Sequence, residues 1–394
     1  MQDTSAVQRT KPGAYGMQRL TGLGMVVLLL VACSESDNSV AVDTPQADSA
    51  AGVVATSPEP AIPPCEESNG IRTVCGFRNP EDLVVVPGGE FLLVSEMGTF
   101  LSDAPGALSL LDVQREQRRD LPISWQRGPD DERWGDVNCM APTPERLSPH
   151  GIDLLTRDDG RHQLLVVNHG DEQVEFFELA QIDANWQLQW MGCAKPPGDP
   201  FINDVAGLRD GGFVATHMWD KGIPFADVVA RLTAGEATGW VWQWLPASGF
   251  TKLPDSDDLM PNGITVSPDG NTVFVNVYMG NKTVRINRIS GIREGELNVK
   301  NPDNIVLGED GHLWVASHLN EPVEGRCPDG HSGPCLLPFQ IFKADPATMT
   351  AEVVFRHEGA PMGYVTVALP HAGRVYFGTA SGDRLASIVL PGAQ

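Results

Sequence analysis

The sequence predicts an all-β protein, a six-bladed β-propeller with a short helical lid insertion. Two observations support this fold class. The 394 residues include 41 glycines and 31 prolines, and only 20% are charged, as in a large, turn-rich β protein with an ample core. In addition, one strand–turn–strand unit occurs six times. Repeats of about 40 to 70 residues built from short strands are typical of propellers, in which each repeat forms one four-stranded blade.

The repeated unit is clearest in residues 261–276, PNGITVSPDGNTVFVN. A short turn with one amide side chain precedes a β-branched run, and a tight Ser-Pro-Asp-Gly turn leads into a second strand. Proline and glycine set the turn geometry, and β-branched residues favour the pleated strand. The other copies occupy residues 79–98, 149–170, 202–218, 302–318 and 364–382. We expect one blade to be closed by strands from both ends of the domain, and the inner strands to begin near Asp82, Ile152, Val205, Ile264, Ile305 and Val365.

Polar side chains recur at one position of the repeat. Four copies place an oxygen-bearing side chain eight residues before the turn glycine, namely Glu81, Asn203, Asn262 and Asp303. The second copy aligns His150 with this position, and the sixth offers Tyr364 with Thr366 close by. Inner strands line the central channel of a propeller, so these positions converge on its axis. Two carboxylates and several amide oxygens, including that of Asn304, suit Ca²⁺, which takes about 6 to 8 oxygen ligands. The alternative is that they are turn-forming residues without a ligand role.

The N-terminus has the features of an export signal. Arg19 precedes an apolar run at residues 25–31, which ends in Leu-Val-Ala-Cys at residues 30–33 and is too short to span a bilayer as a helix. It resembles the lipobox of bacterial lipoproteins, in which the cysteine is lipidated. We therefore expect a signal peptide at residues 1–33, with Met17 as an alternative start, and a lipid anchor on Cys33. By the same resemblance, Ser34 after the cysteine favours the outer membrane of the bacterial cell envelope. The alternative is an ordinary secretory signal with an incidental cysteine.

Residues 34–64 are rich in Ser, Asp, Ala, Thr and Pro, and we expect a disordered linker. The propeller is then assigned to residues 65–394. The formal net charge of −23 argues against nucleic acid or an anionic membrane surface as a partner, which leaves the lipid anchor as the membrane contact. P-loop, HExxH, GxSxG and zinc-spaced Cys/His motifs are absent from the sequence, so nucleotide-binding, zincin and serine-hydrolase functions lack support. We expect a monomer.

Six cysteines follow the lipobox, an even number that indicates disulfides in an exported chain. Fifteen pairings are possible. We favour Cys65–Cys75, Cys139–Cys193 and Cys327–Cys335, because two of these close short local loops. Free buried thiols are the alternative. Cys327 and Cys335 fall in a Gly- and Pro-rich stretch, residues 320–335, that we interpret as a stapled surface loop.

The segment between the third and fourth copies differs from the other connections. Phe225, Val228, Val229 and Leu232 have helical spacing, whereas Trp240, Trp242 and Trp244 alternate as in a strand. An insertion directly after an inner strand could form an apolar lid over the channel mouth. Equally, it could be blade structure with a tryptophan stripe facing the core.

Five short segments carry a further signal: PHGI at 149–152, VVNH at 166–169, IND at 202–204, NGI at 262–264 and DNI at 303–305. With these segments the chain resembles the paraoxonase/arylesterase family, which is related to the gluconolactonase, regucalcin and strictosidine-synthase-like propellers. The resemblance covers most of residues 76–385. It implies a six-bladed propeller with two axial calcium ions that hydrolyses lactones and aryl esters.

The resemblance also assigns roles to residues. It implies a catalytic calcium held by Glu81, Asn203, Asn262, Asp303 and Asn304, and a structural calcium held by Asp82, Asp204 and the carbonyl of Ile152. Asp82 and Asp204 each follow a ligand of the first site, and adjacent strand residues point in opposite directions. His150 and His169 match a histidine pair, one acting as general base on water and the other orienting it. His318 and Thr366 match positions near the substrate pocket. His217 is also assigned to the pocket, although it departs from the family, which carries Asn-Asp at residues 217–218.

The sequence thus predicts an envelope-anchored, calcium-dependent hydrolase of lactones or aryl esters, in which the metal polarises the ester carbonyl and the histidine pair activates water. Two alternatives remain. One is a sugar-lactone hydrolase similar to the gluconolactonases, with one metal. The other is a non-catalytic, ligand-binding propeller lipoprotein. Three features depart from the family: the lid sequence differs, His217 and Met218 replace Asn-Asp, and no cysteine follows Cys335 to join the chain ends.

Overall fold

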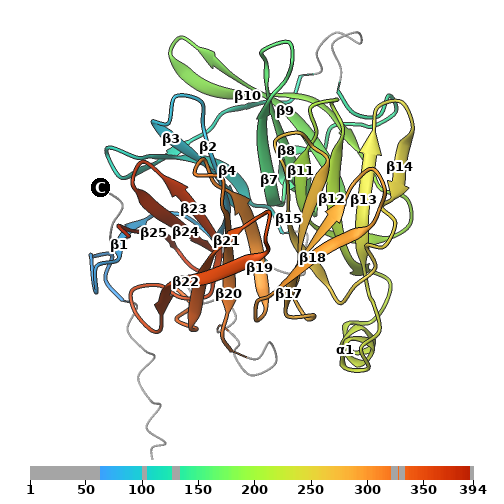
Figure 1. Ribbon diagram of the computed structural model, residues 1–394. Coiled ribbons are helices and arrows are strands. Elements are labelled where there is room, and N and C mark those ends of the chain that lie inside the picture. Colours follow the sequence, from blue (N-terminus) through green and yellow to red (C-terminus); the bar gives the residue numbers. More distant parts are fainter. Residues whose placement is uncertain (1–62, 100–103, 127–133, 321–326, 328–332, 391–394) are drawn as a thin grey trace, which may run out of the picture. The chain divides into compact units, whose positions relative to one another are not determined.

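The computed structural model describes residues 63–99, 104–126, 134–320, 327 and 333–390. The predicted signal peptide with Cys33, and residues 34–62 of the predicted linker, lie outside this part of the chain. The described strands form six sheets, the blades of a six-bladed β-propeller (Figure 1). The predicted fold class is therefore confirmed.

The blades follow one another along the chain. Blade 1 consists of β2 (Pro80–Val85), β3 (Phe91–Glu96), β4 (Ala107–Asp112) and β5 (Gln117–Asp120). Blade 2 consists of β7 (Pro149–Thr156), β8 (His162–Asn168), β9 (Gln173–Ile182) and β10 (Asn185–Ala194), and a short strand, β6 (Ile123–Ser124), pairs parallel to β10. Blade 3 consists of β11 (Pro200–Gly207), β12 (Phe213–Asp220), β13 (Trp240–Leu245) and β14 (Gly249–Lys252).

Blade 4 consists of β15 (Pro261–Val266), β16 (Thr272–Val277), β17 (Lys282–Asn287) and β18 (Arg293–Asn298). Blade 5 consists of β19 (Pro302–Leu307), β20 (Leu313–His318), β21 (Phe339–Asp345) and β22 (Thr350–His357). Blade 6 combines β23 (Val365–His371), β24 (Arg374–Thr379) and β25 (Arg384–Ile388) with β1 (Arg72–Cys75) from the other end of the domain. The antiparallel pairing of β1 with β25 confirms the predicted closure.

Each inner strand begins with an irregularity. In five blades the strand starts two to five residues before its predicted start, at a proline. Regular pairing then breaks and resumes at Asp82, Ile152, Val205, Ile264 and Ile305, and in blade 6 it breaks between Val365 and Val367. Such bulges re-aim side chains next to functional sites. The repeat position with the polar side chains lies within these irregular residues.

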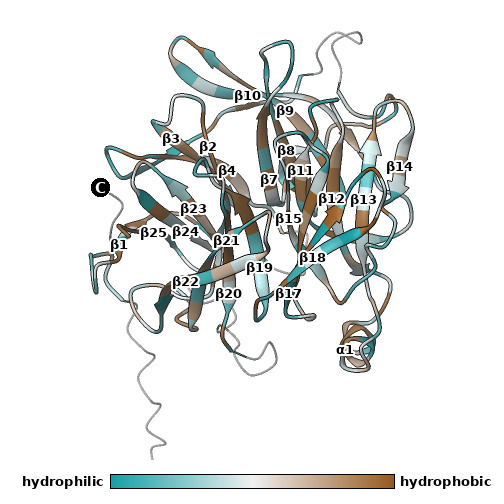
Figure 2. Ribbon diagram, viewed as in Figure 1, coloured by the Kyte–Doolittle hydropathy of each residue, from teal (hydrophilic) through white to brown (hydrophobic). Residues whose placement is uncertain are grey.

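The apolar core lies between neighbouring blades. The second strands are buried on both faces, as in β20, where all six residues are buried, because a blade packs on each side. One cluster joins Leu93 and Leu110 of blade 1 to Ile152 and Trp190 of blade 2. Figure 2 shows the apolar residues concentrated in the strands. The blades therefore hold the inner strands in a fixed ring.

The segment after β12 contains both structures considered from the sequence. Residues Phe225–Thr233 form α1, which lies outside the blades, and the tryptophan stripe is strand β13 of blade 3 (Figure 1). Val228 and Leu232 of α1 pack in a cluster with Phe201, Trp219 and residues 260 and 278, at the ends of strands where the inner strands begin. In the described residues, α1 is the one α-helix, and no helix there has the length and apolarity to cross a bilayer.

Three disulfides are present, Cys65–Cys75, Cys139–Cys193 and Cys327–Cys335, and they are the pairs favoured from the sequence. Cys65–Cys75 ties the chain before β1 to blade 6. Cys139–Cys193 joins the segment before blade 2 to β10. Most of the loop closed by Cys327–Cys335 lies outside the described residues.

Candidate active site

The beginnings of the inner strands bring the predicted metal ligands together. Asn304 Nδ2 donates a hydrogen bond of 2.9 Å to Glu81 Oε1, which joins blade 5 to blade 1. Thr366 Oγ1 of blade 6 donates to the Glu81 carbonyl at 2.7 Å, and Thr216 Oγ1 of blade 3 donates to the Asn262 carbonyl at 2.6 Å. Residues more than 200 positions apart therefore meet at one end of the channel.

The predicted ligands present oxygen atoms that nothing else binds. Among the described residues, four buried side-chain oxygens of this group have no hydrogen-bond partner: Glu81 Oε2, Asn203 Oδ1, Asn262 Oδ1 and Asn304 Oδ1. A buried polar atom without a partner costs free energy, about 1 to 3 kcal/mol, so such atoms are rare in isolation. Four on equivalent strands fit a hard cation that accepts oxygen ligands.

The site also concentrates buried negative charge. Glu81, Asp82, Asp204 and Asp303 are all less than 10% exposed. In the described part of the chain, no Lys or Arg nitrogen forms an ion pair with any of them. Burial, then repulsion from neighbouring carboxylates, raises the pKa of Asp82, Asp204 and Asp303 well above the usual range. No described cluster offers three or more His, Cys, Asp or Glu ligands to one metal. Carboxylates and amides together make up this donor set.

Asp82 and Asp204 link neighbouring inner strands. The Asp82 carboxylate accepts the backbone N–H groups of Leu83 and Ile152, each at 2.8 Å. The Asp204 carboxylate accepts those of Val205 and Ile264, again at 2.8 Å. Each of these four carboxylate oxygens thus accepts one backbone N–H group. They differ in this from the four unpartnered oxygens of Glu81, Asn203, Asn262 and Asn304. Each carboxylate oxygen of Asp82 and Asp204 retains a second lone pair for a cation.

Two glycines of the recognised segments allow these strands to approach. A Cβ at Gly151 would lie 2.2 Å from Asp204 Oδ1, and one at Gly263 would lie 2.5 Å from the Asp303 carbonyl oxygen. Glycine is required here for close passage of a neighbouring strand. The glycines of PHGI and NGI are therefore needed for packing between blades, and the same segments also position predicted ligands.

His150 and His169 form a hydrogen-bonded pair beside this group. His150 Nδ1 lies 2.6 Å from His169 Nε2, and both rings are almost fully buried. His150 Nε2 lies 3.6 Å from Glu81 Oε1. This nitrogen therefore faces the buried oxygens of the predicted metal ligands, which we call the axial group. Burial favours the neutral ring, but attraction to Glu81 and other carboxylates raises the pKa of His150. Burial lowers the pKa of His169.

The three predicted pocket residues occupy different surroundings. Thr366 contacts Glu81, as described above. His318 Nε2 lies 3.5 Å from Asp303 Oδ2 and 3.0 Å from the Val365 carbonyl oxygen, and its Nδ1 accepts the Tyr278 hydroxyl at 2.9 Å. Burial lowers the pKa of His318 to about 4, so the ring is neutral at pH 7. His217 instead packs on Trp240 of its own blade, with ring centroids 4.0 Å apart, and is the predicted residue least connected to the axial group.

Two residues of the site were not predicted, Glu172 and Lys221. Glu172 Oε1 accepts from His169 Nδ1 at 3.0 Å and from Lys221 Nζ at 2.9 Å. Glu172 has a positive φ of 48°, which is uncommon for a residue other than glycine. Attraction to His169 and Lys221 overcomes the effect of burial and lowers the pKa of Glu172. In the sequence, the one indication of a role for Glu172 is that this carboxylate follows His169 by three residues. Glu172 does not occupy the repeat position that the predicted metal ligands share.

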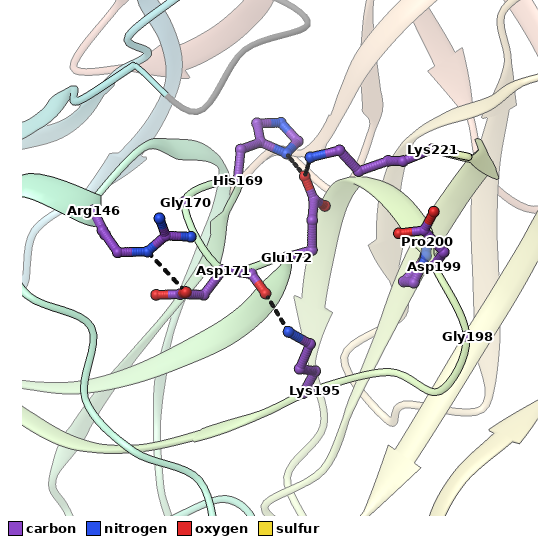
Figure 3. A pocket seen from close by; sticks show the side chains of 10 residues that line it. All are labelled: Arg146, His169, Gly170, Asp171, Glu172, Lys195, Gly198, Asp199, Pro200 and Lys221. Carbon is purple, nitrogen blue, oxygen red and sulfur yellow. Dashed lines mark hydrogen bonds and ion pairs between the residues drawn. The ribbon is translucent and has the colours of Figure 1, made fainter. Parts of the chain in front are cut away.

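A cleft of about 440 Å³ lies beside His169, and Figure 3 shows the residues that line it. His169 and Glu172 lie on one wall with Lys221, and Arg146 pairs with Asp171 on another. The predicted metal ligands do not line it. The histidine pair thus separates a buried axial oxygen group from an open polar cleft.

Comparisons with known proteins match the same part of the chain. A family model described as Arylesterase matches residues 78–385. The chain is 24% identical over 332 residues to human serum paraoxonase/arylesterase 1 and 23% identical over 331 residues to human serum paraoxonase/arylesterase 2, and each alignment covers 81% of this chain and 86% of the relative. The chain is also 29% identical over 174 residues to strictosidine synthase from Catharanthus roseus. This alignment covers 42% of this chain and 45% of the relative.

Proposed function

The chain belongs to the arylesterase family, and on that premise we propose that it is a calcium-dependent hydrolase of lactones or aryl esters. The four buried side-chain oxygens without a partner carry the proposal, because they belong to the residues assigned as metal ligands from the sequence. Glu81, Asn203, Asn262, Asp303 and Asn304 would hold the catalytic ion. Bound calcium would supply an electrophile for the ester carbonyl oxygen and its developing negative charge.

The histidine pair would perform the proton chemistry. His150 Nε2 faces the axial group and would remove a proton from the attacking water as the carbon–oxygen bond forms. The same proton would pass to the alkoxide oxygen of the leaving group when the acyl–oxygen bond breaks. His169 would hold the His150 ring through the 2.6 Å contact. His318 would stay neutral beside Asp303, and α1 would limit access of water to the channel mouth.

The number of ions distinguishes two forms of this proposal. Asp82 and Asp204 would hold a second, structural ion with the Ile152 carbonyl, as in the two-ion prediction. Each of these carboxylates already accepts two backbone N–H groups, one on each oxygen, and each oxygen keeps a second lone pair for the ion. Equilibrium dialysis and metal analysis count the bound calcium. We expect two ions, and one would support the sugar-lactone alternative.

The decisive experiment is a panel of lactones and aryl esters assayed with and without calcium. Hydrolysis that requires calcium supports the proposal. A folded, calcium-binding protein that hydrolyses none of the panel would instead be a ligand-binding propeller with a structural metal. The panel also orders the substrates by ring size and chain length.

We further propose that the protein works outside the cytoplasm, as a monomer attached through a lipid on Cys33. The three disulfides support export, because such bonds persist in oxidising compartments. The proposed substrate is a small molecule, and the acidity of the chain gives no reason to expect a nucleic-acid partner.

A further inference from the structure

We propose that Glu172 is a positioning residue that selects which nitrogen of His150 acts as the base, an inference that rests on the proposed function. Glu172 touches neither the axial oxygens nor His150 in the contacts observed. It acts on His150 through His169, whose Nδ1 lies 3.0 Å from Glu172 Oε1. The chain Glu172–His169–His150 ends at the nitrogen that faces Glu81.

The hydrogen bonds fix the proton on each ring. An ionised carboxylate only accepts, so the proton between Glu172 and His169 is on His169 Nδ1. A neutral imidazole has one N–H, and His169 Nε2 must therefore accept. The proton in the 2.6 Å contact is then on His150 Nδ1. His150 Nε2 is left with its lone pair directed towards the axial group, which is the state that a general base requires.

This assignment depends on Glu172 being ionised, and its surroundings favour that form. Lys221 Nζ donates to Glu172 Oε1 at 2.9 Å, and the Ile202 backbone N–H donates to Oε2 at 3.3 Å. Three donors converge on one carboxylate that is only 8% exposed. The positive φ of Glu172 is a local backbone cost that directs this side chain back towards His169.

Packing fixes the His169 ring in the plane that these bonds need. The Phe201 ring stacks on it with centroids 4.6 Å apart and an angle of 6° between the planes. Trp219 stacks on the other side of Phe201 at 4.8 Å, and α1 packs beyond it in the same cluster. The ring cannot rotate freely, so the proton position is set by Glu172 rather than by ring motion.

The test uses Glu172→Ala in the full-length protein, with Asp199→Ala as the matched control. Both residues line the cleft, but Asp199 does not contact the histidine pair. We expect Glu172→Ala to lower kcat by about 10- to 100-fold, as for other residues that orient a functional histidine, with little change in KM. Formate, a carboxylate small enough for the cleft, should restore part of kcat in this variant and not in the control. Loss of kcat that formate never restores would overturn the inference.

Nitrogen NMR of the histidine rings reads the proton positions without substrate. We expect a protonated Nδ1 on His169 in the native protein, loss of this preference in Glu172→Ala, and its return with formate. Unchanged tautomers in Glu172→Ala would overturn the inference. If the native protein hydrolyses no ester or lactone, the proposed function fails, while the NMR result still decides the role of Glu172.

Lys221→Met provides a second variant that keeps the carboxylate. Loss of the Lys221 charge should raise the pKa of Glu172, so the protonated Nδ1 of His169, read by nitrogen NMR, is lost at a higher pH than in the native protein. Lys195→Met, which removes a charge from the same cleft, should leave that pH unchanged. An equal shift in both variants would indicate a general charge effect and count against the inference.

Discussion

His150 Nδ1 and His169 Nε2 lie 2.6 Å apart, which makes the two rings a single hydrogen-bonded unit. The unit has an inner end at Glu81 and an outer end at Glu172. The protonation of the two rings is therefore coupled to two carboxylates that have different roles. Glu81 belongs to the proposed metal site, and Glu172 sets the tautomer.

Replacing His150 separates base chemistry from metal binding. His150→Gln leaves all proposed ligands in place, so calcium affinity should be unchanged, while turnover falls by about 10²- to 10⁴-fold. The acidic limb of the pH profile should disappear, since it reports deprotonation of the base. Calcium titration and steady-state kinetics on the same preparation check both. Unchanged hydrolysis in both His150→Gln and His169→Gln would exclude the pair from the mechanism.

The fold and the axial oxygens follow from the repeat, because a propeller places equivalent repeat positions around one axis. Glu81, Asn203, Asn262 and Asp303 share a register that is readable without structure. The close approach of these side chains depends on irregular pairing at the start of each inner strand. Because of this irregular pairing, the observed strands begin at earlier residues than predicted. Alternation alone does not encode these irregularities.

Glu172 shows why the rest of the site was not predictable. It lies in the connection between β8 and β9, where the repeat has no fixed register. Its contact with His169 depends on a left-handed backbone conformation, and Lys221 joins it from the end of β12, 49 residues away. Such contacts depend on the packing of blade 2 against blade 3.

The proposed ligands should affect metal binding and catalysis together. Glu81→Ala and Asp303→Ala should each abolish measurable activity and weaken calcium binding, because the remaining oxygens under-coordinate the ion. Asp303→Asn gives a more specific signature. It removes a buried charge that no Lys or Arg of the described residues neutralises, so it should raise the melting temperature without calcium and lower it with calcium. Scanning calorimetry in both conditions checks this. Equal shifts in the two would argue against a ligand role for Asp303.

The disulfides should differ in their contribution to stability according to the loops they close. Cys65–Cys75 and Cys327–Cys335 close loops of 10 and 8 residues, whereas Cys139–Cys193 closes one of 54. The chain-entropy relation gives about 2 to 3 kcal/mol for the short loops and about 4 kcal/mol for the long one. Replacing both cysteines of each pair with alanine and measuring urea unfolding checks the order. A larger loss for the Cys327–Cys335 pair would contradict it.

The lipid anchor is tested at Cys33, outside the described residues. Cys33→Ser should release the protein from the membrane fraction, because a lipobox cysteine is the site of lipid attachment. Activity per molecule should stay the same, since none of the proposed site residues lies before residue 81. Fractionation followed by assay of both fractions measures the two outcomes. Retention of the variant in membranes would require another means of attachment.

The stabilisation by calcium should grow as the pH rises. Burial and mutual repulsion raise the pKa of Asp82, Asp204 and Asp303 in the folded, metal-free protein, whereas the unfolded chain titrates at about pH 4. Between these values the folded state holds protons that the unfolded state has released. The stability of the metal-free protein therefore falls as the pH rises through this window.

Calcium reverses this trend, because it binds the ionised carboxylates and neutralises their repulsion. Protons compete with it at low pH, so its affinity and its contribution to stability increase through the same window. We expect the difference in melting temperature between calcium-loaded and EDTA-treated protein to be small near pH 4.5 and large near pH 7.5. Taking the difference at each pH cancels titrating groups away from the proposed ligands, such as His217. A difference independent of pH would show that calcium binds away from these carboxylates.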